Sequence, residues 1–448
     1  MKIQLSDHFT YKKLLRFTLP SVGMMIFSSI YGVIDGFFVS NFAGETAFTA
    51  VNFIMPFLMI LGAFGFMFGA GGSALVAKTL GEGKREKANS LFSLFVYVSF
   101  GLGVLIAILG IVLLRPIASL LGAEGAMLES CIDYGWIIAM GLPFFMLQME
   151  FQSFMITAEK PQLSLIFTVA AGVTNIVLDA LFVGAFGWGL EGAAAATVTS
   201  QFVGFICPFV YFLRKNTSLL RIGKTKMDFG ALVKTCTNGS SELMTNISMS
   251  LVGVLYNYQL LEYAGEPGVA AYGVLLYVNF IFISAFIGYS IGCAPIIGYH
   301  YGAENSAELK GILKKSIVIV GISSVTMVCL SIALATPMSY IFVGYNESLF
   351  DLTKDAFLLY SFSFLFSGFA IFGSSFFTAL NNGPISAIIS FLRTLVFQTV
   401  AVILLPIIFE GAGGEGIDGI WFSIVVAEAL AVAVTVAFLL AKRKKYNY

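Results

Sequence analysis

Charged residues are scarce in this sequence, and their scarcity excludes an ordinary soluble domain. Only 11% of the 448 residues are Asp, Glu, Lys or Arg, whereas 58% are hydrophobic. Soluble globular domains carry about 25% charged residues. The composition is therefore that of an integral membrane protein.

Residues that support catalysis or hold metals are also scarce. The chain has two histidines, His8 and His300, and no H-E-x-x-H motif, which argues against a zinc enzyme in the membrane. Its five cysteines lack paired spacing and predict small buried side chains, without disulfides or a metal framework. The loops 81–89 and 302–310 lack the spacing of a nucleotide-binding loop. No cofactor and no nucleic-acid partner is expected, and an intramembrane enzyme is a remote alternative.

Long apolar runs recur along nearly the whole chain. Each covers roughly 18 to 30 residues, enough to cross a hydrocarbon core of about 30 Å. The ten-residue alternation of a membrane barrel is missing. The pattern predicts an all-α integral membrane protein with twelve transmembrane helices. The expected spans are approximately 14–40, 47–78, 89–114, 131–157, 162–186, 190–213, 234–261, 268–301, 312–336, 354–380, 384–409 and 417–441.

Basic residues are distributed unevenly between the two sides of these spans. If the N-terminus is cytoplasmic, only Arg115 and Lys354 of the 25 basic residues lie on the outer side. The positive-inside rule therefore predicts that both termini are cytoplasmic and that the number of spans is even.

An internal repeat divides the chain into two halves. Five short motifs or single residues of the first half recur in the second half, each 221 residues later except the last, which recurs 223 residues later. Two six-helix bundles of this kind enter the membrane in the same sense and are related by a pseudo-twofold axis along the membrane normal. We expect an N-terminal bundle at 1–213, a cytoplasmic linker at 214–233 and a C-terminal bundle at 234–448. The matches are AGE at 43–45 and 264–266, Gly71 and Gly292, Gly81 and Gly302, Pro116 and Pro337, and Pro161 and Pro384.

Two acids within the apolar spans predict a cation site. A carboxylate at membrane depth costs about 2.5 to 3.5 kcal/mol on insertion scales and usually has a function. A rise of about 1.5 Å per residue places Asp35, Asn175 and Asp179 at similar depth in the outer half of the membrane, with Thr197 near the same level. Two such acids must share a proton, bind a cation or take up an organic cation. The alternative is that Asp35 and Asp179 bond backbone groups near helix ends.

A second polar pocket is predicted in the C-terminal half. Glu242 and Glu428 lie at comparable depth, Asn246 follows Glu242 by one turn, and Gln201 occupies the repeat position of Glu428. Together these residues indicate a site for a cation or a cationic substrate. The alternative is an acid that forms an interhelical hydrogen bond and is kept neutral by burial.

Glu150 and Arg393 fall in the inner halves of their spans. Arg393 is the lone base at depth. We expect them to pair with each other or with partners in the loops, as a structural ion pair or a cytoplasmic gate.

Several of these residues resemble those of the multidrug and toxic compound extrusion (MATE) family, in its bacterial drug-exporting branch. The resemblance covers essentially the whole chain. The residues that carry it are Pro20, Asp35, the G-x-G turn at 81–83, NIVLD at 175–179, Thr197 and Glu242 in GSSE.

The resemblance implies a V-shaped transporter that exports cationic amphipathic drugs against an inward flow of Na⁺ or H⁺. It implies a monomer in the bilayer of a bacterial inner membrane, with Asp35, Asn175, Asp179 and Thr197 as its cation site. No other metal is implied. The stretch 356–380 of the span 354–380 has no acid to face Glu242, so a metal-ion site in the C-terminal half is not expected.

Two other transporter classes remain open. A flippase for lipid-linked oligosaccharides needs several bases in its cavity to hold a diphosphate, whereas only Arg393 lies at depth. A major facilitator carrier also has six plus six spans, but its inner loop carries an acid followed by paired arginines, which the stretch 80–87 matches only loosely.

Overall fold

The computed structural model describes residues 3–43 and 45–448, and every regular element in them is helical. The predicted all-α fold is therefore confirmed. Gly44, at the centre of the first AGE motif, lies outside the described residues. In chain order the elements are α1 (Tyr11–Phe38), η1 (Val39–Ala43), α2 (Glu45–Gly81), α3 (Arg85–Leu121), α4 (Gly125–Thr157), α5 (Pro161–Asp179), η2 (Ala180–Ala185), α6 (Gly189–Leu213), α7 (Phe229–Gly302), α8 (Ser306–Val343), α9 (Glu347–Ser361), α10 (Phe364–Ala379), α11 (Gly383–Phe391), η3 (Leu392–Phe397), α12 (Gln398–Gly411) and α13 (Gly416–Tyr446).

Short polar side chains start several of these helices. The side chain of Asp228 accepts the N–H of Ala231 at the start of α7, and Asn305 does the same for Glu308 at the start of α8. Such caps satisfy N–H groups that have no partner within the helix. The helices therefore begin in the polar turns between apolar runs.

The longest element, α7, is two helices that double back on each other. Gly265 interrupts it with a positive φ of 65°. The rings of Tyr256 and Tyr272 stack with their centroids 5.4 Å apart, whereas sixteen residues of a straight helix would separate them by about 24 Å. The predicted spans 234–261 and 268–301 are these two arms.

The described residues make twelve membrane crossings. Ten helices qualify separately by length and hydropathy, and the pair α9 and α10, bent by 48°, forms one further crossing. The two arms of α7 add the last. The total agrees with the number expected from the sequence.

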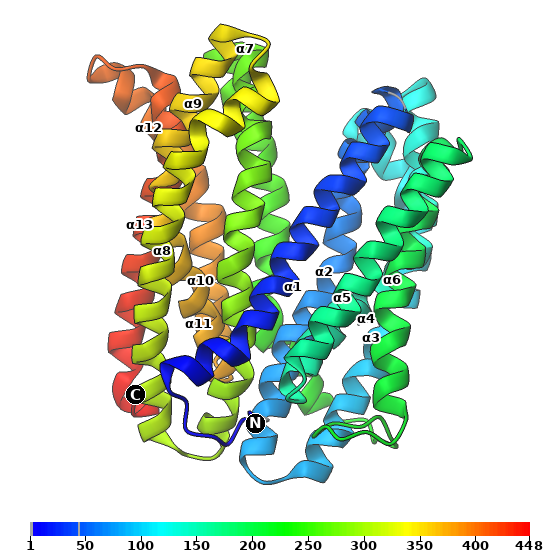
Figure 1. The fold of residues 1–448 in the computed structure, drawn as a ribbon, viewed down its shortest axis with the longest axis vertical. Helices are drawn as coiled ribbons and strands as arrows, with labels where there is room; N and C mark the ends of the chain where they lie inside the picture. The colour runs from blue at the N-terminus through cyan, green and yellow to red at the C-terminus, as the bar shows by residue number, and fades with distance from the viewer. Residues whose placement is uncertain (1–2, 44) are drawn as a thin grey trace.

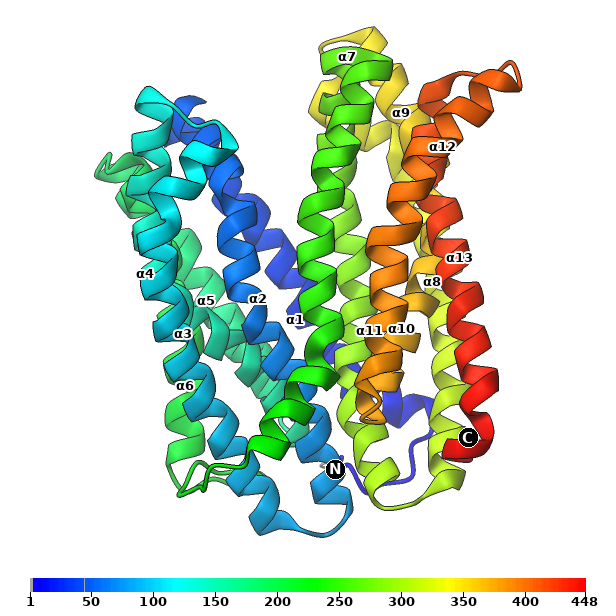
Figure 2. The same cartoon turned by 180° about the vertical axis from the view of Figure 1, so that it is seen from behind.

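The helices form two bundles that meet at one end (Figure 1, Figure 2). We call α1–α6 the N-lobe and α7–α13 the C-lobe. Both chain termini lie at the end where the lobes converge, here called the terminal end, and the lobes diverge toward the opposite, far end (Figure 1). The exact domain limits expected from the sequence stay a prediction.

Glycines bring the two lobes into backbone contact at the terminal end. A Cβ atom on Gly81 of α2 would overlap the carbonyl oxygen of Tyr299 in α7. Reciprocally, a Cβ on Gly302 of α7 would overlap the carbonyl oxygen of Lys78 in α2. Gly81 and Gly302 are repeat partners, and so are Lys78 and Tyr299. The contact therefore obeys the predicted pseudo-twofold relation.

Helix α1 joins the two lobes. Its residue Thr18 contacts Gly292 of the second arm of α7, and the backbone of Ser21 contacts Gly288 of the same arm. Further along, the Ser29 hydroxyl lies within hydrogen-bonding distance of Ser284. Contacts of α1 with the C-lobe thus extend from Thr18 to Ser29, while Phe27 and Tyr31 pack against Gly172 of α5 in the N-lobe.

The segment before α1, residues 3–10, lies across the terminal end and is here called the N-terminal strap. Leu5 and Phe9 are fully buried. The Leu5 N–H donates to Oε1 of Glu159 in the N-lobe, and the Phe9 N–H donates to Oε1 of Glu308 in the C-lobe, both at 2.8 Å. The strap therefore holds both lobes at once.

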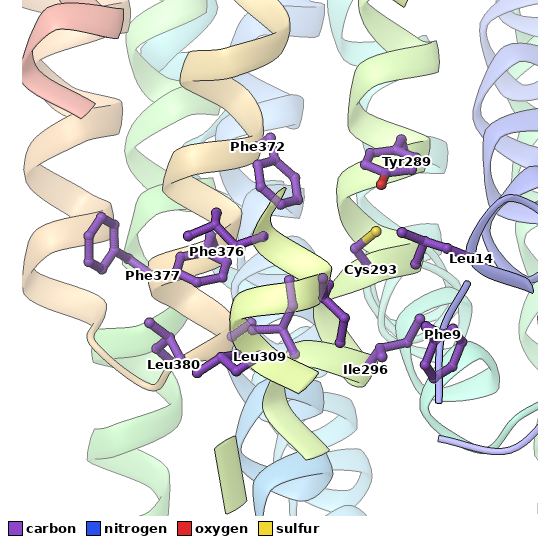
Figure 3. Packing of buried hydrophobic residues seen from close by; sticks show 14 of the residues in the cluster. Phe9, Leu14, Tyr289, Cys293, Ile296, Leu309, Phe372, Phe376, Phe377 and Leu380 are labelled. Carbon is purple, nitrogen blue, oxygen red and sulfur yellow. The ribbon is translucent and has the colours of Figure 1, made fainter. Parts of the chain in front are cut away.

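The same end contains a hydrophobic cluster that ties the strap and α1 to the C-lobe (Figure 3). Its apolar side chains come from the strap, α1, the second arm of α7, α8 and α10. This packing extends the inter-lobe contact beyond the glycines. The labelled members are Phe9, Leu14, Tyr289, Cys293, Ile296, Leu309, Phe372, Phe376, Phe377 and Leu380.

Large apolar side chains are exposed along the outer helices. Leu105, Ile108 and Val112 of α3 are about half exposed or more, as expected where the solvent is lipid. All five cysteines are free. Cys131 and Cys293 are buried as predicted and Cys207 and Cys236 are partly buried, whereas the prediction is wrong for Cys329, which is exposed.

Candidate functional site

Four polar side chains from three helices of the N-lobe meet in one cluster. The Thr197 hydroxyl of α6 donates to Oδ1 of Asp35 in α1 at 3.4 Å. Asn175 and Asp179 of α5 lie within interaction distance of the Asp35 carboxyl group. Asn175 and Asp179 are buried, with exposed fractions of 2% and 0%. The structure thus brings together the four residues expected from the sequence.

Close packing between α1 and α5 makes this meeting possible. A Cβ on Gly172, one turn before Asn175, would collide with the rings of Phe27 and Tyr31 in α1. Because glycine has no side chain, α1 approaches α5 closely enough for Asp35 to reach across.

The two acids are also followed by irregular helix. The π-helical turn η2 begins directly after Asp179, and η1 begins four residues after Asp35. Such turns are rare and frequently mark functional sites.

The cluster is rich in hydrogen-bond acceptors and poor in donors. Both carboxylate oxygens of Asp179 and the amide oxygen of Asn175 are buried and have no hydrogen-bond partner among the described residues. Two neighbouring carboxylates in a dry setting are not both ionised without a compensating positive charge. Oxygen atoms of this kind suit a proton or a hard cation such as Na⁺. The oxygen atoms of the cluster therefore suit either a proton or Na⁺.

The C-lobe contains a buried ion pair. Nε of Arg393, in η3, donates to both carboxylate oxygens of Glu428 in α13, at 2.8 and 3.0 Å. The exposed fractions of the two side chains are 13% and 2%. Glu242, in the first arm of α7, lies close enough to Arg393 to interact with it electrostatically. Asn246 is one turn further along α7 and donates its amide N–H to the Glu242 carbonyl at 2.8 Å.

A family model for MatE proteins matches the chain over residues 20–181 and again over residues 243–404. The chain belongs to the MATE family of membrane transporters. One match lies in each lobe, and together they cover well over half of the sequence. The family consists of transporters, so this MATE chain is not an enzyme.

Curated relatives align with this MATE protein over nearly its full length. It is 27% identical over 447 residues to the multidrug export protein MepA of Staphylococcus saprophyticus, covering 97% of this chain and 94% of the relative. It is 24% identical to the MepA protein of Staphylococcus haemolyticus, with the same coverage. The relationship is therefore distant but complete in length.

Solved structures share the fold. A MATE protein crystallised in complex with MaL6 superimposes with a TM-score of 0.90 at 23% identity, covering 98% of this chain and 97% of that one. A structure described as the outward-facing conformation of a multidrug resistance MATE family transporter superimposes with a TM-score of 0.89 at 22% identity, with the same coverage. The V-shaped arrangement of this MATE chain is thus that of its family.

Two of the expected groupings in this MATE protein are wrong. Glu150 does not pair with Arg393, because Glu150 lies in α4 of the N-lobe and Arg393 bonds Glu428. Gln201 does not join the C-lobe residues either. It lies on α6, where its Oε1 approaches Gly141 of α4 and has no hydrogen-bond partner among the described residues.

Glu150 is buried without a charged partner. Its exposed fraction is 0%, and neither carboxylate oxygen has a hydrogen-bond partner among the described residues. Ser99 of α3 is its polar neighbour. An ionised carboxylate without a partner is costly to bury in such surroundings.

Tyr134 belongs beside the N-lobe cluster, although the sequence did not indicate it. It lies on α4, is 2% exposed, and is within electrostatic range of both Asp35 and Asp179. Its hydroxyl contacts the sulfur of Met55 at 3.9 Å. No periodic pattern distinguishes this tyrosine from the other aromatic residues of the chain. Tyr31 also interacts electrostatically with Asp35. Its place beside the cluster could have been predicted, because it lies four residues before Asp35 on the same helical face.

Proposed function

We propose that this protein is a secondary active multidrug exporter that exchanges cationic amphipathic drugs for H⁺ or Na⁺ by alternating access. The observation that carries the proposal is the pair Asp35 and Asp179, because the buried oxygens of Asp179 have no hydrogen-bond partner among the described residues and suit a small cation. The full-length similarity to proteins named multidrug export protein MepA supports drugs as the cargo.

The proposed coupling acts through α1. A cation that enters from the far end neutralises the Asp35 and Asp179 cluster and changes how the second half of α1 packs on α5. Because the first half of α1 is fixed against the second arm of α7, this change is transmitted to the contact between the lobes. Pro20, inside α1, interrupts its hydrogen bonding between the two halves. Bound drug is then released toward the far end.

The energy must come from an ion gradient. Moving one charge through the membrane potential supplies about 2.3 kcal/mol per 100 mV. Exchange of one monovalent cation for one monovalent drug moves no net charge. A concentration gradient of the ion, or more than one ion per drug, must therefore drive export.

The proposal also includes the orientation of the protein in the membrane and its state of assembly. The terminal end faces the cytoplasm of a bacterial plasma membrane, as the distribution of basic residues predicts, and the protein acts as a monomer. The coupling cation binds in the N-lobe alone, because the C-lobe acids Glu428 and Glu242 already have the guanidinium of Arg393 beside them.

Drug efflux from vesicles tests the proposal. Asp35→Asn and Asp179→Asn keep the side-chain size but remove the charge, and each is expected to reduce ethidium export at least tenfold. Asp133→Asn, at an exposed acid of α4, is the matched control and should export normally. Wild-type export by both cluster variants would reject the proposal. Imposing a proton gradient and a sodium gradient separately on proteoliposomes identifies the coupling ion.

A further inference from the structure

The starts of α1 and α5 line a cavity at the terminal end, here called the α1–α5 cavity. Its volume is about 340 Å³. The two helices lie next to each other (Figure 1), and the N-terminal strap and the turn before α5 complete the lining. The lining includes Arg16 of α1, Glu159 and Lys160 of the turn, Ile166 of α5 and Ile3 of the strap.

The second half of the repeat is closed at the equivalent place. Lys160 corresponds to Gly383, 223 residues later, by the same spacing that relates Pro161 to Pro384. A Cβ on Gly383 would overlap the carbonyl oxygen of Thr237 in the first arm of α7, so the two helices touch there through their backbones. In the first half a lysine takes the place of this glycine, and α1 and α5 part around the cavity. The α1–α5 cavity is thus a departure from the repeat, and it comes with a basic residue.

Two basic side chains in the lining have hydrogen-bond donors that the protein does not use. Arg16 is exposed and has no hydrogen-bond or ion-pair partner among the described residues. Nζ of Lys160 donates to Oγ1 of Thr217 at 3.1 Å, which uses one of the three donors of an ammonium group. The acid in the lining, Glu159, accepts the N–H of Leu5 in the strap. With two bases and one acid, the lining carries a net charge of one positive unit.

The surface that continues from the cavity toward the far end is apolar. Ile166 lines the cavity and is about half exposed, and so are Val173 and Val177, which follow it by seven and eleven residues on the same face of α5. Leu19, three residues after Arg16 on α1, is exposed to a similar extent. Exposed apolar side chains within a membrane span contact acyl chains. A basic cavity at the end of the spans therefore adjoins a surface that faces lipid.

We propose that the α1–α5 cavity binds an anionic phospholipid from the leaflet at the terminal end, with the phosphate held by Arg16 and Lys160 and the acyl chains along the apolar face of α5. Basic pockets between transmembrane helices bind anionic head groups in this way. A phosphodiester with a single negative charge matches the net charge of the lining. Because Ile3 also lines the cavity, the bound lipid rests against the strap. The proposal does not depend on the exporter function.

The charges determine the size of the expected effect. Each base near a membrane surface favours an anionic lipid by about fivefold. A net charge of one unit therefore predicts that phosphatidylglycerol binds about fivefold more tightly than phosphatidylcholine, whose choline group carries a positive charge of its own. Losing charge-assisted hydrogen bonds to the phosphate reduces affinity further, by about 10- to 100-fold.

Native mass spectrometry of the purified full-length protein tests the proposal. Titration with phosphatidylglycerol and with phosphatidylcholine of the same acyl chains should show the fivefold preference in the wild-type protein. This comparison needs no variant, and equal affinities would overturn the proposal.

A double variant locates the site. Arg16→Gln combined with Lys160→Gln should lower the affinity for phosphatidylglycerol at least tenfold and abolish the preference. Arg443→Gln with Lys444→Gln removes the same charge from exposed positions of α13 in the C-lobe and should keep the wild-type preference, because charges further apart than about 10 Å are largely screened. A wild-type affinity for phosphatidylglycerol in the Arg16 and Lys160 variant would refute the assignment.

Inorganic phosphate distinguishes a lipid from a free anion. Millimolar phosphate, added at constant ionic strength, should leave the binding of phosphatidylglycerol unchanged, because it has no acyl chains to contact α5. Displacement of the lipid would identify a site for free phosphate and overturn the lipid assignment. Ile166→Ser keeps both bases but removes apolar surface, and it should weaken phosphatidylglycerol binding at least threefold. An unchanged affinity in this variant would show that the acyl chains do not lie on α5.

Discussion

Removing the Glu308 carboxylate should release the N-terminal strap from the C-lobe. Oε1 of Glu308 accepts the buried N–H of Phe9 at 2.8 Å, and Oε2 lies 2.6 Å from Nδ1 of His8. A hydrogen bond to a charged group is worth about 1.5 to 3 kcal/mol. The contact with His8 adds at most about 1 kcal/mol, because that side chain is 72% exposed.

Together these contacts hold the strap closed by about 1.5 to 4 kcal/mol, which corresponds to a factor of roughly 10 to 700 in its opening equilibrium. Hydrogen exchange measured by mass spectrometry on peptides covering residues 3–10 should therefore accelerate by this factor in Glu308→Ala. Glu308→Gln keeps an acceptor for Phe9 and should give a smaller increase. Glu86→Ala, at an exposed acid in the first turn of α3, is the control and should leave exchange unchanged.

The strap bridges both lobes, so its release should also change the distance between them. Spin labels on Lys215→Cys and Lys310→Cys, both exposed positions at the terminal end, report this distance in a chain whose five native cysteines are replaced by alanine. Glu308→Ala should gain a population at longer distance. Unchanged exchange in residues 3–10 of Glu308→Ala would refute the reasoning, because the carboxylate would then contribute nothing to holding the strap.

Three further predictions follow from the packing and the charges. Gly172→Val should push α1 away from α5, because the new side chain meets Phe27 and Tyr31. We expect the protein to lose about 1 to 3 kcal/mol of stability and to export ethidium more weakly. A thermal unfolding curve equal to that of wild type would contradict this prediction. Arg393→Met alone should destabilise the protein by about 3 to 5 kcal/mol, because it leaves Glu428 buried without its partner. The double variant Arg393→Met with Glu428→Met should lose much less stability, and denaturant unfolding of the two variants measures the difference. The hydrogen bond from Lys84 holds the pKa of Glu82 below its usual value of 4.5, so its stabilisation is present above that value and is lost as the pH falls through the lowered pKa. Glu82→Gln should cost under about 1 kcal/mol at pH 7 and progressively less as the pH is lowered below 4.5, measured by thermal unfolding across this range.

Depth along the membrane normal could be predicted from the sequence, because helix rise is regular. The positions of Asp35, Asn175 and Asp179 were placed at one level by counting residues from the ends of their spans, and the structure brings them together. The repeat-related glycines likewise indicated the pseudo-twofold relation, which the reciprocal contacts of Gly81 and Gly302 show.

Position around the bundle could not be predicted, because hydropathy patterns do not fix which helices are neighbours. Glu150 and Arg393 were expected to meet because both fall in inner halves of spans, yet they belong to different lobes. The N-terminal strap escaped prediction for a related reason. Its partners Glu159 and Glu308 are 154 and 299 residues away from Leu5 and Phe9, and no local pattern connects such distant residues.

The reciprocal contact of Gly81 and Gly302 has a consequence for each half of the chain. A surface that fits its own repeat also fits a second copy of itself, which is the condition for an isologous dimer. Each half of this protein therefore carries both sides of the joint, as each subunit of an isologous dimer does.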